Sequence, residues 1–138
     1  MMFHYRTTRN RYASYPRPKG CSFCTAIEPD HLQAETAHHT ILTNRVMYDV
    51  WELRRVTDHL LVIPKRHVKG LGELTNAEKL DHINIIAEYE LKGYNVYARG
   101  IGSLQRSVEH QHTHLIRTGS KQARGSLSIK KPYFLITF

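Results

Sequence analysis

The order of hydrophobic and polar residues predicts several short strands. Residues 59–64 form a continuous apolar run that ends in a proline, which is typical of a buried central strand. Four other segments are rich in β-branched and aromatic residues or alternate between apolar and polar ones, and we expect strands there: 40–43, 46–53, 94–99 and about 107–117. A last apolar run over 132–138 indicates a final strand.

One helix is predicted over residues 75–92. It begins with a capping box, in which the Thr75 hydroxyl and the Glu78 carboxylate satisfy N–H groups of the first turn. Gly93 can take the left-handed conformation that ends a helix. Apolar residues line one face of this helix, namely Leu80, Ile83, Ile86 and Ala87. The pattern predicts an α+β fold, with a mostly antiparallel sheet and one main helix.

The chain of 138 residues suits a single domain. Residues 1–20 show neither helical nor strand periodicity, and we expect an irregular basic arm there, followed by one domain over 21–138. Residues 118–131 are rich in Gly, Ser and Lys, which predicts a connector to the final strand. No apolar run approaches the roughly 18–20 residues that cross a bilayer, so we expect no contact with membranes.

The positive charge lies at the two ends of the chain. The net charge is +8, yet all 12 acidic residues fall between Glu28 and Glu109. The ends carry ten cations and no acid: Arg6, Arg9, Arg11, Arg17, Lys19, Arg117, Lys121, Arg124, Lys130 and Lys131. Such ends favour partners that carry phosphate, either nucleotides or nucleic acid, although a solvated basic surface has the same composition.

Three histidines alternate along one predicted strand. If His110, His112 and His114 lie on a strand, their rings project from the same face about 6.7 Å apart. Imidazole acts as base, nucleophile or metal ligand near neutral pH. A fortuitous surface cluster and a metal site are the alternatives to a catalytic row. Tyr48 and Trp51 are interpreted as core residues, with a wall for base stacking as the alternative.

The chain has two cysteines, Cys21 and Cys24. We expect a cytoplasmic protein, where disulfides are uncommon, so the pair is a redox motif, half of a zinc site or two reduced thiols. A redox pair of the thioredoxin type follows a strand and opens a helix. This pair follows an arm rich in Arg and Pro, which argues against that reading.

Three motifs together resemble the histidine triad (HIT) superfamily of nucleotide hydrolases and transferases. The first is the row His110, His112 and His114, preceded by Ser107 and Val108. The second is segment 58–67, Asp-His-Leu-Leu-Val-Ile-Pro-Lys-Arg-His, which is similar to the family's strand Gly-His-x-Leu-Val-Ile-Pro-Lys-x-His. The third is Cys-Ser-Phe-Cys at 21–24, similar to the opening of zinc-binding bacterial members. The resemblance covers about residues 21–117.

The resemblance implies a HIT-like fold and covalent chemistry. His112 is then expected to attack the α-phosphate of a nucleotide derivative and form a nucleotidyl-histidine, with His114 and His59 beside the phosphate. The expected substrates are dinucleoside polyphosphates, phosphoramidates or nucleotide sugars. Water as acceptor makes the protein a hydrolase, and a phosphate or sugar phosphate makes it a transferase.

The substrate-binding positions depart from the family pattern. Where many members have an Asn-x-Gly loop and a Gly-Gln before the serine, this chain has 99–101 and Gln105-Arg106. We expect Ser107, Arg106 and Gln105 to contact phosphate. Glu52 is the carboxylate nearest to the position of the family's ribose-binding Asp.

The resemblance also implies a structural zinc ion and a homodimer. The zinc ligands of the bacterial branch map to Cys21, Cys24, His67 and His110. The family commonly forms homodimers through the helix and a sheet edge.

Two other functions remain open at this point. A zinc-stabilised module that binds nucleotide or RNA without turnover would use the basic ends. A metal-dependent hydrolase with zinc on all three triad histidines would lose its activity to chelators.

Overall fold

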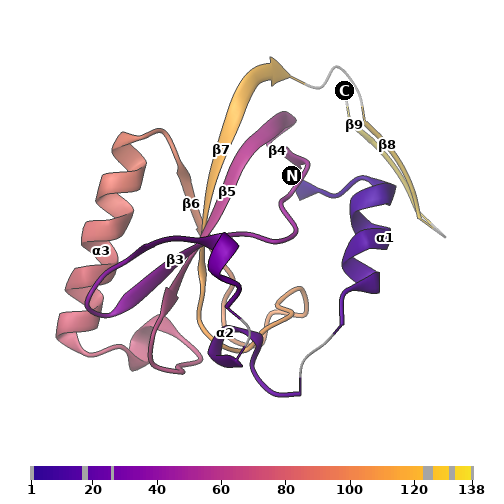
Figure 1. The fold of residues 1–138 in the computed structure, drawn as a ribbon. Coiled ribbons are helices and arrows are strands. Elements are labelled where there is room, and N and C mark those ends of the chain that lie inside the picture. Colours follow the sequence, from indigo (N-terminus) through magenta and orange to yellow (C-terminus); the bar gives the residue numbers. More distant parts are fainter. Residues whose placement is uncertain (1, 17–18, 26, 123–125, 131–132, 138) are drawn as a thin grey trace.

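The computed structural model describes residues 2–16, 19–25, 27–122, 126–130 and 133–137. At its centre lies β5 (Arg54–Pro64) in an antiparallel sheet (Figure 1). One edge of β5 pairs with β7 (Thr113–Gln122), and the other pairs with β4 (Val50–Trp51) at its start and β3 (His39–Thr43) at its end. The apolar run 59–64 is therefore a buried central strand, as predicted.

Three short strands complete the main sheet. β1 (Met2–Phe3) pairs with β4, β2 (Leu32–Glu35) with β3, and β6 (Asn95–Ala98) with β7, all antiparallel. β8 (Ser126–Lys130) and β9 (Tyr133–Thr137) form a separate two-stranded sheet. The prediction of an α+β fold with a mostly antiparallel sheet is confirmed.

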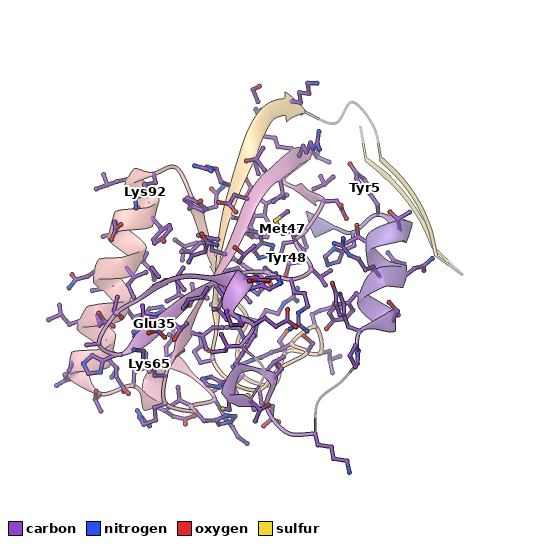
Figure 2. The ribbon with its side chains drawn as sticks, viewed as in Figure 1. Tyr5, Glu35, Met47, Tyr48, Lys65 and Lys92 are labelled. Carbon is purple, nitrogen blue, oxygen red and sulfur yellow. The ribbon has the colours of Figure 1, made fainter. Side chains whose placement is uncertain are left out.

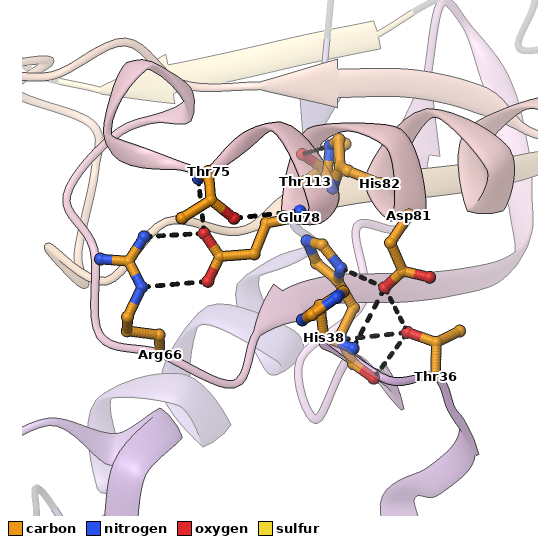
Figure 3. Close-up of polar contacts among 9 residues, drawn as sticks. Thr36, His38, Arg66, Thr75, Glu78, Asp81, His82 and Thr113 are labelled. Carbon is orange, nitrogen blue, oxygen red and sulfur yellow. Dashed lines mark hydrogen bonds and ion pairs between the residues drawn. The ribbon is translucent and has the colours of Figure 1, made fainter.

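The main helix, α3 (Asn76–Leu91), covers one face of the sheet. Thr75 and Glu78 form the predicted capping box, and Arg66 donates two hydrogen bonds to the Glu78 carboxylate, at 2.7 and 3.0 Å (Figure 3). These bonds satisfy the first turn of the helix and fix its start beside the end of β5.

Side chains alternate between the two faces of β5 and β7. Leu60, Val62 and Leu115 point to α3, where they form a core cluster with Ile85 and Ile41. The residues between them point to the other face. His59 is opposite Ile116, and Leu61 is opposite His114. Period-two geometry thus gives this sheet a hydrophobic face under α3 and a face that carries histidines.

The apolar face predicted for α3 is not the face that packs on the sheet. Leu80 and Ile83 are 61% and 55% exposed, whereas Ile85 and His82 are buried. The His82 Nε2 lies 3.2 Å from the Thr113 hydroxyl, so a polar contact with β7 accompanies the buried apolar residues and sets the orientation of the helix (Figure 3).

Beside this contact a buried histidine meets a carboxylate of the helix. His39 is fully buried on β3, and its Nδ1 lies 2.8 Å from the Asp81 carboxylate on α3. The Thr36 hydroxyl donates to the same carboxylate at 2.6 Å (Figure 3). The pair joins the helix to the edge of β3.

The predicted irregular arm is folded. Residues 6–14 form helix α1 (Arg6–Ser14), after β1. The Asp49 carboxylate accepts the Tyr5 N–H at 2.7 Å and the Thr8 hydroxyl at 3.0 Å, which satisfies the start of the helix from outside. The prediction failed because α1 depends on this distant carboxylate, which no local pattern shows.

Two strand predictions and the predicted connector need correction. The expected strand 46–53 is reduced to β4, because Glu52 and Leu53 have positive φ angles (49° and 60°) and turn the chain into β5. The expected strand 107–117 begins only at Thr113 and runs on to Gln122. The expected connector contains β8.

Several positions named in the sequence analysis lie outside the described residues. Pro132 and Phe138, at the ends of the expected final strand, lie outside the described residues, as do the cationic positions Arg17, Arg124 and Lys131. In the described residues no helix is long and apolar enough to cross a membrane.

Candidate active site and metal centre

A cavity of about 1350 Å³ opens on the histidine-bearing face of the sheet. His112, His114 and Leu61 belong to its wall on the sheet side. Further wall residues come from α1, from the short helix α2 (Ser22–Thr25) and from the loop that follows β6. α3 covers the opposite face of the sheet (Figure 1), so the residues that line the cavity lie on the face that the helix leaves open.

Only one histidine of the predicted row lies within a strand. His114 is in β7, whereas His110 and His112 precede it. The alternation nevertheless extends backwards, because Thr113 contacts α3 while the rings of His112 and His114 lie next to each other, 5.1 Å between centroids. His110 turns away from this pair and toward the cysteines.

The orientation of the His112 ring is fixed by a backbone carbonyl. Its Nδ1 lies 2.8 Å from the carbonyl oxygen of His110. Because a carbonyl accepts only, Nδ1 carries the proton and Nε2 has the lone pair. Burial lowers the pKa of His112, which favours the neutral ring. In the described part of the chain Nε2 has no hydrogen-bond partner, so the nitrogen with nucleophilic character is available.

A backbone amide fixes the protons of the other two rings. The Tyr48 N–H donates to His59 Nδ1 at 3.1 Å, so the neutral ring of His59 carries its proton on Nε2. That Nε2 lies 2.8 Å from His114 Nδ1 and donates to it. His114 must then carry its own proton on Nε2, which is buried and has no partner among the described residues. The result is an N–H donor beside His112.

Burial keeps these rings neutral. It lowers the pKa of His59 to about 3 and that of His114 to about 2, and the nearby imidazoles add to both shifts, as does Arg99 to that of His114. The imidazole–imidazole bond therefore joins two neutral rings at physiological pH.

Aromatic side chains enclose the histidines. The Tyr48 ring lies 4.7 Å from that of His59 and 5.7 Å from that of His114, and Phe23 of α2 meets His112 edge-on at 5.3 Å. Tyr48 is buried at the centre of the molecule, between the sheet and α1 (Figure 2). Its contact with two imidazoles is a role that the sequence pattern did not reveal.

Of the three residues predicted to contact phosphate, two line the cavity and the third holds a loop. Ser107 and Gln105 line the cavity. The Arg106 guanidinium instead donates to the carbonyls of Lys69, Val108 and Glu109, and so holds the loop in shape. Its charge still acts on the cavity by lowering the pKa of His112.

Glu52 does not belong to the residues that line the cavity. It is exposed in the turn between β4 and β5, with a positive φ angle. The structure therefore does not bring it to the triad.

Arg99 is a cation of the cavity that the site prediction missed. It follows β6, and its guanidinium donates to the Tyr48 hydroxyl at 3.1 Å and contacts Met2 Sδ at 3.4 Å. It lowers the pKa of both His112 and His114. Arg99 lies in the loop 99–101, where the sequence departs from the family pattern, and this departure was the available signal.

The four predicted metal ligands meet at one point. Their ligand atoms, from Cys21, Cys24, His67 and His110, all lie within 4.8 Å of one another. Two contacts illustrate the geometry: Cys21 Sγ lies 3.4 Å from His110 Nδ1, and Cys24 Sγ lies 3.3 Å from His67 Nδ1. Two thiols and two imidazoles are a donor set that could hold a metal ion in tetrahedral geometry.

The His110 ring is already oriented as a ligand. Its Nε2 lies 2.9 Å from the Pro64 carbonyl and donates to it, which leaves the lone pair on Nδ1, facing the cysteines. Of the residues that the structure describes, this is the one group of His, Cys, Asp and Glu close enough to share a metal. The three histidines of the row do not form such a group with one another, which argues against zinc on the triad.

Comparison with known proteins supports the motif analysis. Residues 54–121 match the family model of the HIT domain. No curated protein sequence matches the chain.

Similar solved structures include a HIT family hydrolase from Clostridium thermocellum, which is 22% identical over 75% of this chain and 93% of that one, with a TM-score of 0.54. A histidine triad nucleotide-binding protein from Candida albicans is 21% identical, over 83% and 84%, with a TM-score of 0.56. A HIT family hydrolase from Legionella pneumophila is 20% identical, over 75% and 95%, with a TM-score of 0.51. At these identities the likeness establishes the fold.

Proposed function

The chain belongs to the histidine triad superfamily, and on that premise we propose that it is an enzyme acting at the α-phosphate of a nucleotide derivative. The substrate is a dinucleoside polyphosphate, a phosphoramidate or a nucleotide sugar. The observation that carries the proposal is the Nε2 of His112, which lies in a large cavity next to the N–H of His114 and has no hydrogen-bond partner among the described residues.

In the first step, the Nε2 lone pair of His112 bonds to the α-phosphorus. The bond from phosphorus to the leaving group breaks, and the leaving group keeps that electron pair and takes a proton from solvent. The product on the enzyme is a nucleotidyl imidazolium. Its Nδ1–H stays bonded to the His110 carbonyl, 2.8 Å away, which stabilises the positive charge.

In the second step, a water oxygen attacks the phosphorus. The N–P bond breaks, its electron pair returns to His112, and the water releases a proton to solvent. The net reaction consumes one water and releases a nucleoside monophosphate. A sugar phosphate or inorganic phosphate in place of water gives a transferase.

His114 and His59 stabilise the charge that develops on the phosphate. The Nε2–H of His114 has no partner among the described residues, so it is available to a phosphate oxygen without first breaking a bond. His59 acts through His114, because it supplies the donor that keeps this proton on Nε2. Ser107 and Gln105 line the same cavity and are further candidates for phosphate contact.

We propose zinc as the metal of the Cys21, Cys24, His67 and His110 cluster. Zinc favours thiolate and imidazole ligands in a closed tetrahedron, which is a structural arrangement. The ion stabilises the connection between α2 and the segment that precedes β7.

We also propose a homodimer. α3 exposes Leu80 and Ile83, apolar residues that face solvent in a single chain. Nucleic-acid binding through the basic ends and a cytoplasmic location stay predictions from the sequence, as does a ribose contact for Glu52, which the cavity lining does not support.

Trapping the intermediate tests the proposed reaction. The wild type and His112→Asn are incubated with α-³²P-labelled dinucleotides and phosphoramidates, then quenched in base, which preserves phosphohistidine. We expect label on a peptide containing residue 112 in the wild type, and a loss of turnover by at least about 10³-fold in the variant. Equal turnover by the two proteins would contradict the proposal. Tight binding of nucleotide without label or turnover would favour the binding module.

A further inference from the structure

The N-terminal arm, defined here as residues 2–16, faces the triad across the cavity. Its contribution to the wall consists of Met2, His4, Arg9, Tyr12, Tyr15 and Pro16. The sheet supplies the opposite wall, where His112 and His114 lie. The same cavity is thus lined by the histidines of the proposed reaction and by an N-terminal arm to which no role has yet been given.

Contacts near both ends hold the arm in place. At its start, β1 pairs with β4, and Asp49 accepts the Tyr5 N–H and the Thr8 hydroxyl. At its end, the Arg45 guanidinium lies 5.3 Å from the centroid of the Tyr15 ring and pairs with Glu28 at 2.7 Å. α1 is therefore a positioned wall of the cavity.

The arm brings a second cation toward Arg99. Arg9 lies on α1 and Arg99 follows β6, and both line the cavity. Within the described part of the chain neither guanidinium has a carboxylate at ion-pair distance, in contrast to Arg45. Arg99 contacts Met2 Sδ of the arm, so it lies on the side of the cavity that the arm borders. Burial lowers the pKa of the cavity residue His4, and the charges of Arg9 and Arg99 lower it further.

The cavity is also larger than a single nucleotide needs. Its volume of about 1350 Å³ exceeds the range of roughly 300–1,000 Å³ that is common for small-molecule sites. The volume therefore leaves room for groups beyond a nucleoside monophosphate, and residues of α1 line part of it.

We propose that the N-terminal arm forms the leaving-group subsite of this enzyme, in which Arg9 and Arg99 bind the phosphates that follow the attacked one. This inference rests on the proposed function, because the position of His112 defines the attacked phosphate. It selects substrates with a polyphosphate chain over phosphoramidates, whose leaving amine carries no negative charge for the two guanidinium groups.

Binding measurements on the full chain test the subsite. The probes are AMP and α,β-methylene-ATP, which places two further phosphates beyond the first and resists cleavage between them. Isothermal titration compares the wild type with Arg9→Ala, Arg9→Lys and Arg11→Ala. Arg11 is the matched control, because it is an exposed cation of the same helix that does not line the cavity.

We expect the ratio of the two affinities, triphosphate analogue over AMP, to fall about tenfold in Arg9→Ala. Arg9→Lys should retain part of the ratio, and Arg11→Ala should keep the wild-type ratio. An unchanged ratio in Arg9→Ala, or an equal change in Arg11→Ala, would overturn the inference. Thermal unfolding of each variant shows that α1 remains folded.

Failure of the proposed function gives a different result. If no label reaches residue 112 but the affinity ratio depends on Arg9, the chemistry is wrong while the polyphosphate subsite stands. If residue 112 is labelled and the ratio is insensitive to Arg9, the chemistry stands and the subsite is wrong.

Discussion

At the scale of single residues, one backbone amide determines the protonation of the site. The Tyr48 N–H can only donate, so its bond to His59 sets the tautomer of that ring and, through it, that of His114. A carbonyl does the same for His112. Since neither backbone group can reverse its role, the protein by itself holds the lone pair on His112 Nε2 and the proton on His114 Nε2.

Substitution of His59 tests this ordering. His59→Phe keeps an aromatic ring and removes the donor to His114 Nδ1, so the His114 proton can move to Nδ1 and the donor toward phosphate is lost. We expect turnover to fall about 10²-fold, measured as kcat on a dinucleotide substrate. His38→Phe, outside the cavity lining, is the control and should keep its turnover. A fully active His59→Phe would show that the tautomer of His114 does not matter.

The sequence predicted residues with recognisable chemistry and missed those that act through position. The cluster of Cys21, Cys24, His67 and His110 was predicted through the family resemblance, and the structure brings their ligand atoms within 4.8 Å of one another. Tyr48 was assigned to the core, where it is buried, but its contact with the triad was not foreseen, and Arg99 was given no role in the site. The contact of Tyr48 with His114 and the hydrogen bond of Arg99 to Tyr48 join segments that are distant in the sequence, so they leave no local pattern. Arg106 was assigned to phosphate by its neighbourhood, whereas its guanidinium is bonded to loop carbonyls.

At the scale of elements, the metal cluster connects three parts of the chain. Cys21 and Cys24 belong to the region of α2, His67 follows β5, and His110 precedes β7. The carbonyl of His110 orients His112. A metal ion at this cluster, three of whose residues line the cavity, would therefore help to hold the His112 ring in place.

Removal of the metal should affect stability first and activity through it. We expect one zinc per chain by elemental analysis, and a loss of about 3 kcal/mol or more in the free energy of unfolding after chelation, for zinc held 100-fold above its Kd. Cys24→Ser should lose the metal and have lower turnover. Two results together would instead place the ion on the triad: Cys24→Ser keeps zinc at full occupancy, and a chelator abolishes its activity.

The strands and α3 were predictable where the local pattern agreed with the tertiary contacts. The run 59–64 and the capping box at Thr75 are such cases. The buried face of α3 was not, because His82 and Asp81 find buried partners on β7 and near β3 that outweigh the exposure of Leu80 and Ile83.

At the scale of the whole molecule, buried neutral histidines make stability depend on pH. Burial lowers the pKa of His59 to about 3, that of His82 to about 4 and that of His114 to about 2, against about 6.5 in an unfolded chain. Between these values the unfolded chain binds more protons than the folded one. The contribution to stability is therefore complete above about pH 6.5 and is lost as the pH falls toward 4.

Thermal unfolding between pH 7.5 and 5 measures this dependence. We expect the unfolding temperature to fall steadily below about pH 6.5. His82→Gln, which keeps a polar group near Thr113 and lies outside the cavity lining, should have a shallower dependence than the wild type. Parallel curves for the two proteins would show that His82 does not titrate on unfolding.

The fold class followed from the sequence, while the folded N-terminal arm did not. Alternation and the single helix were enough for an antiparallel α+β domain. α1 depends on Asp49, more than 40 positions away from Tyr5, and on pairing of β1 with β4. Contacts of this range have no signature within the arm itself.

The central position of β5 makes substitutions on this strand costly, whereas residues on α1 can be exchanged more freely. His59 sits midway along a strand with neighbours on both edges, so a change there disturbs the most densely buried part of the sheet. Arg9 and Tyr12 stand on a helix attached by a few polar contacts, where side chains can be exchanged without repacking a core. Mutational drift can thus change the wall of the cavity on the side of α1 while the wall that carries the histidines stays as it is.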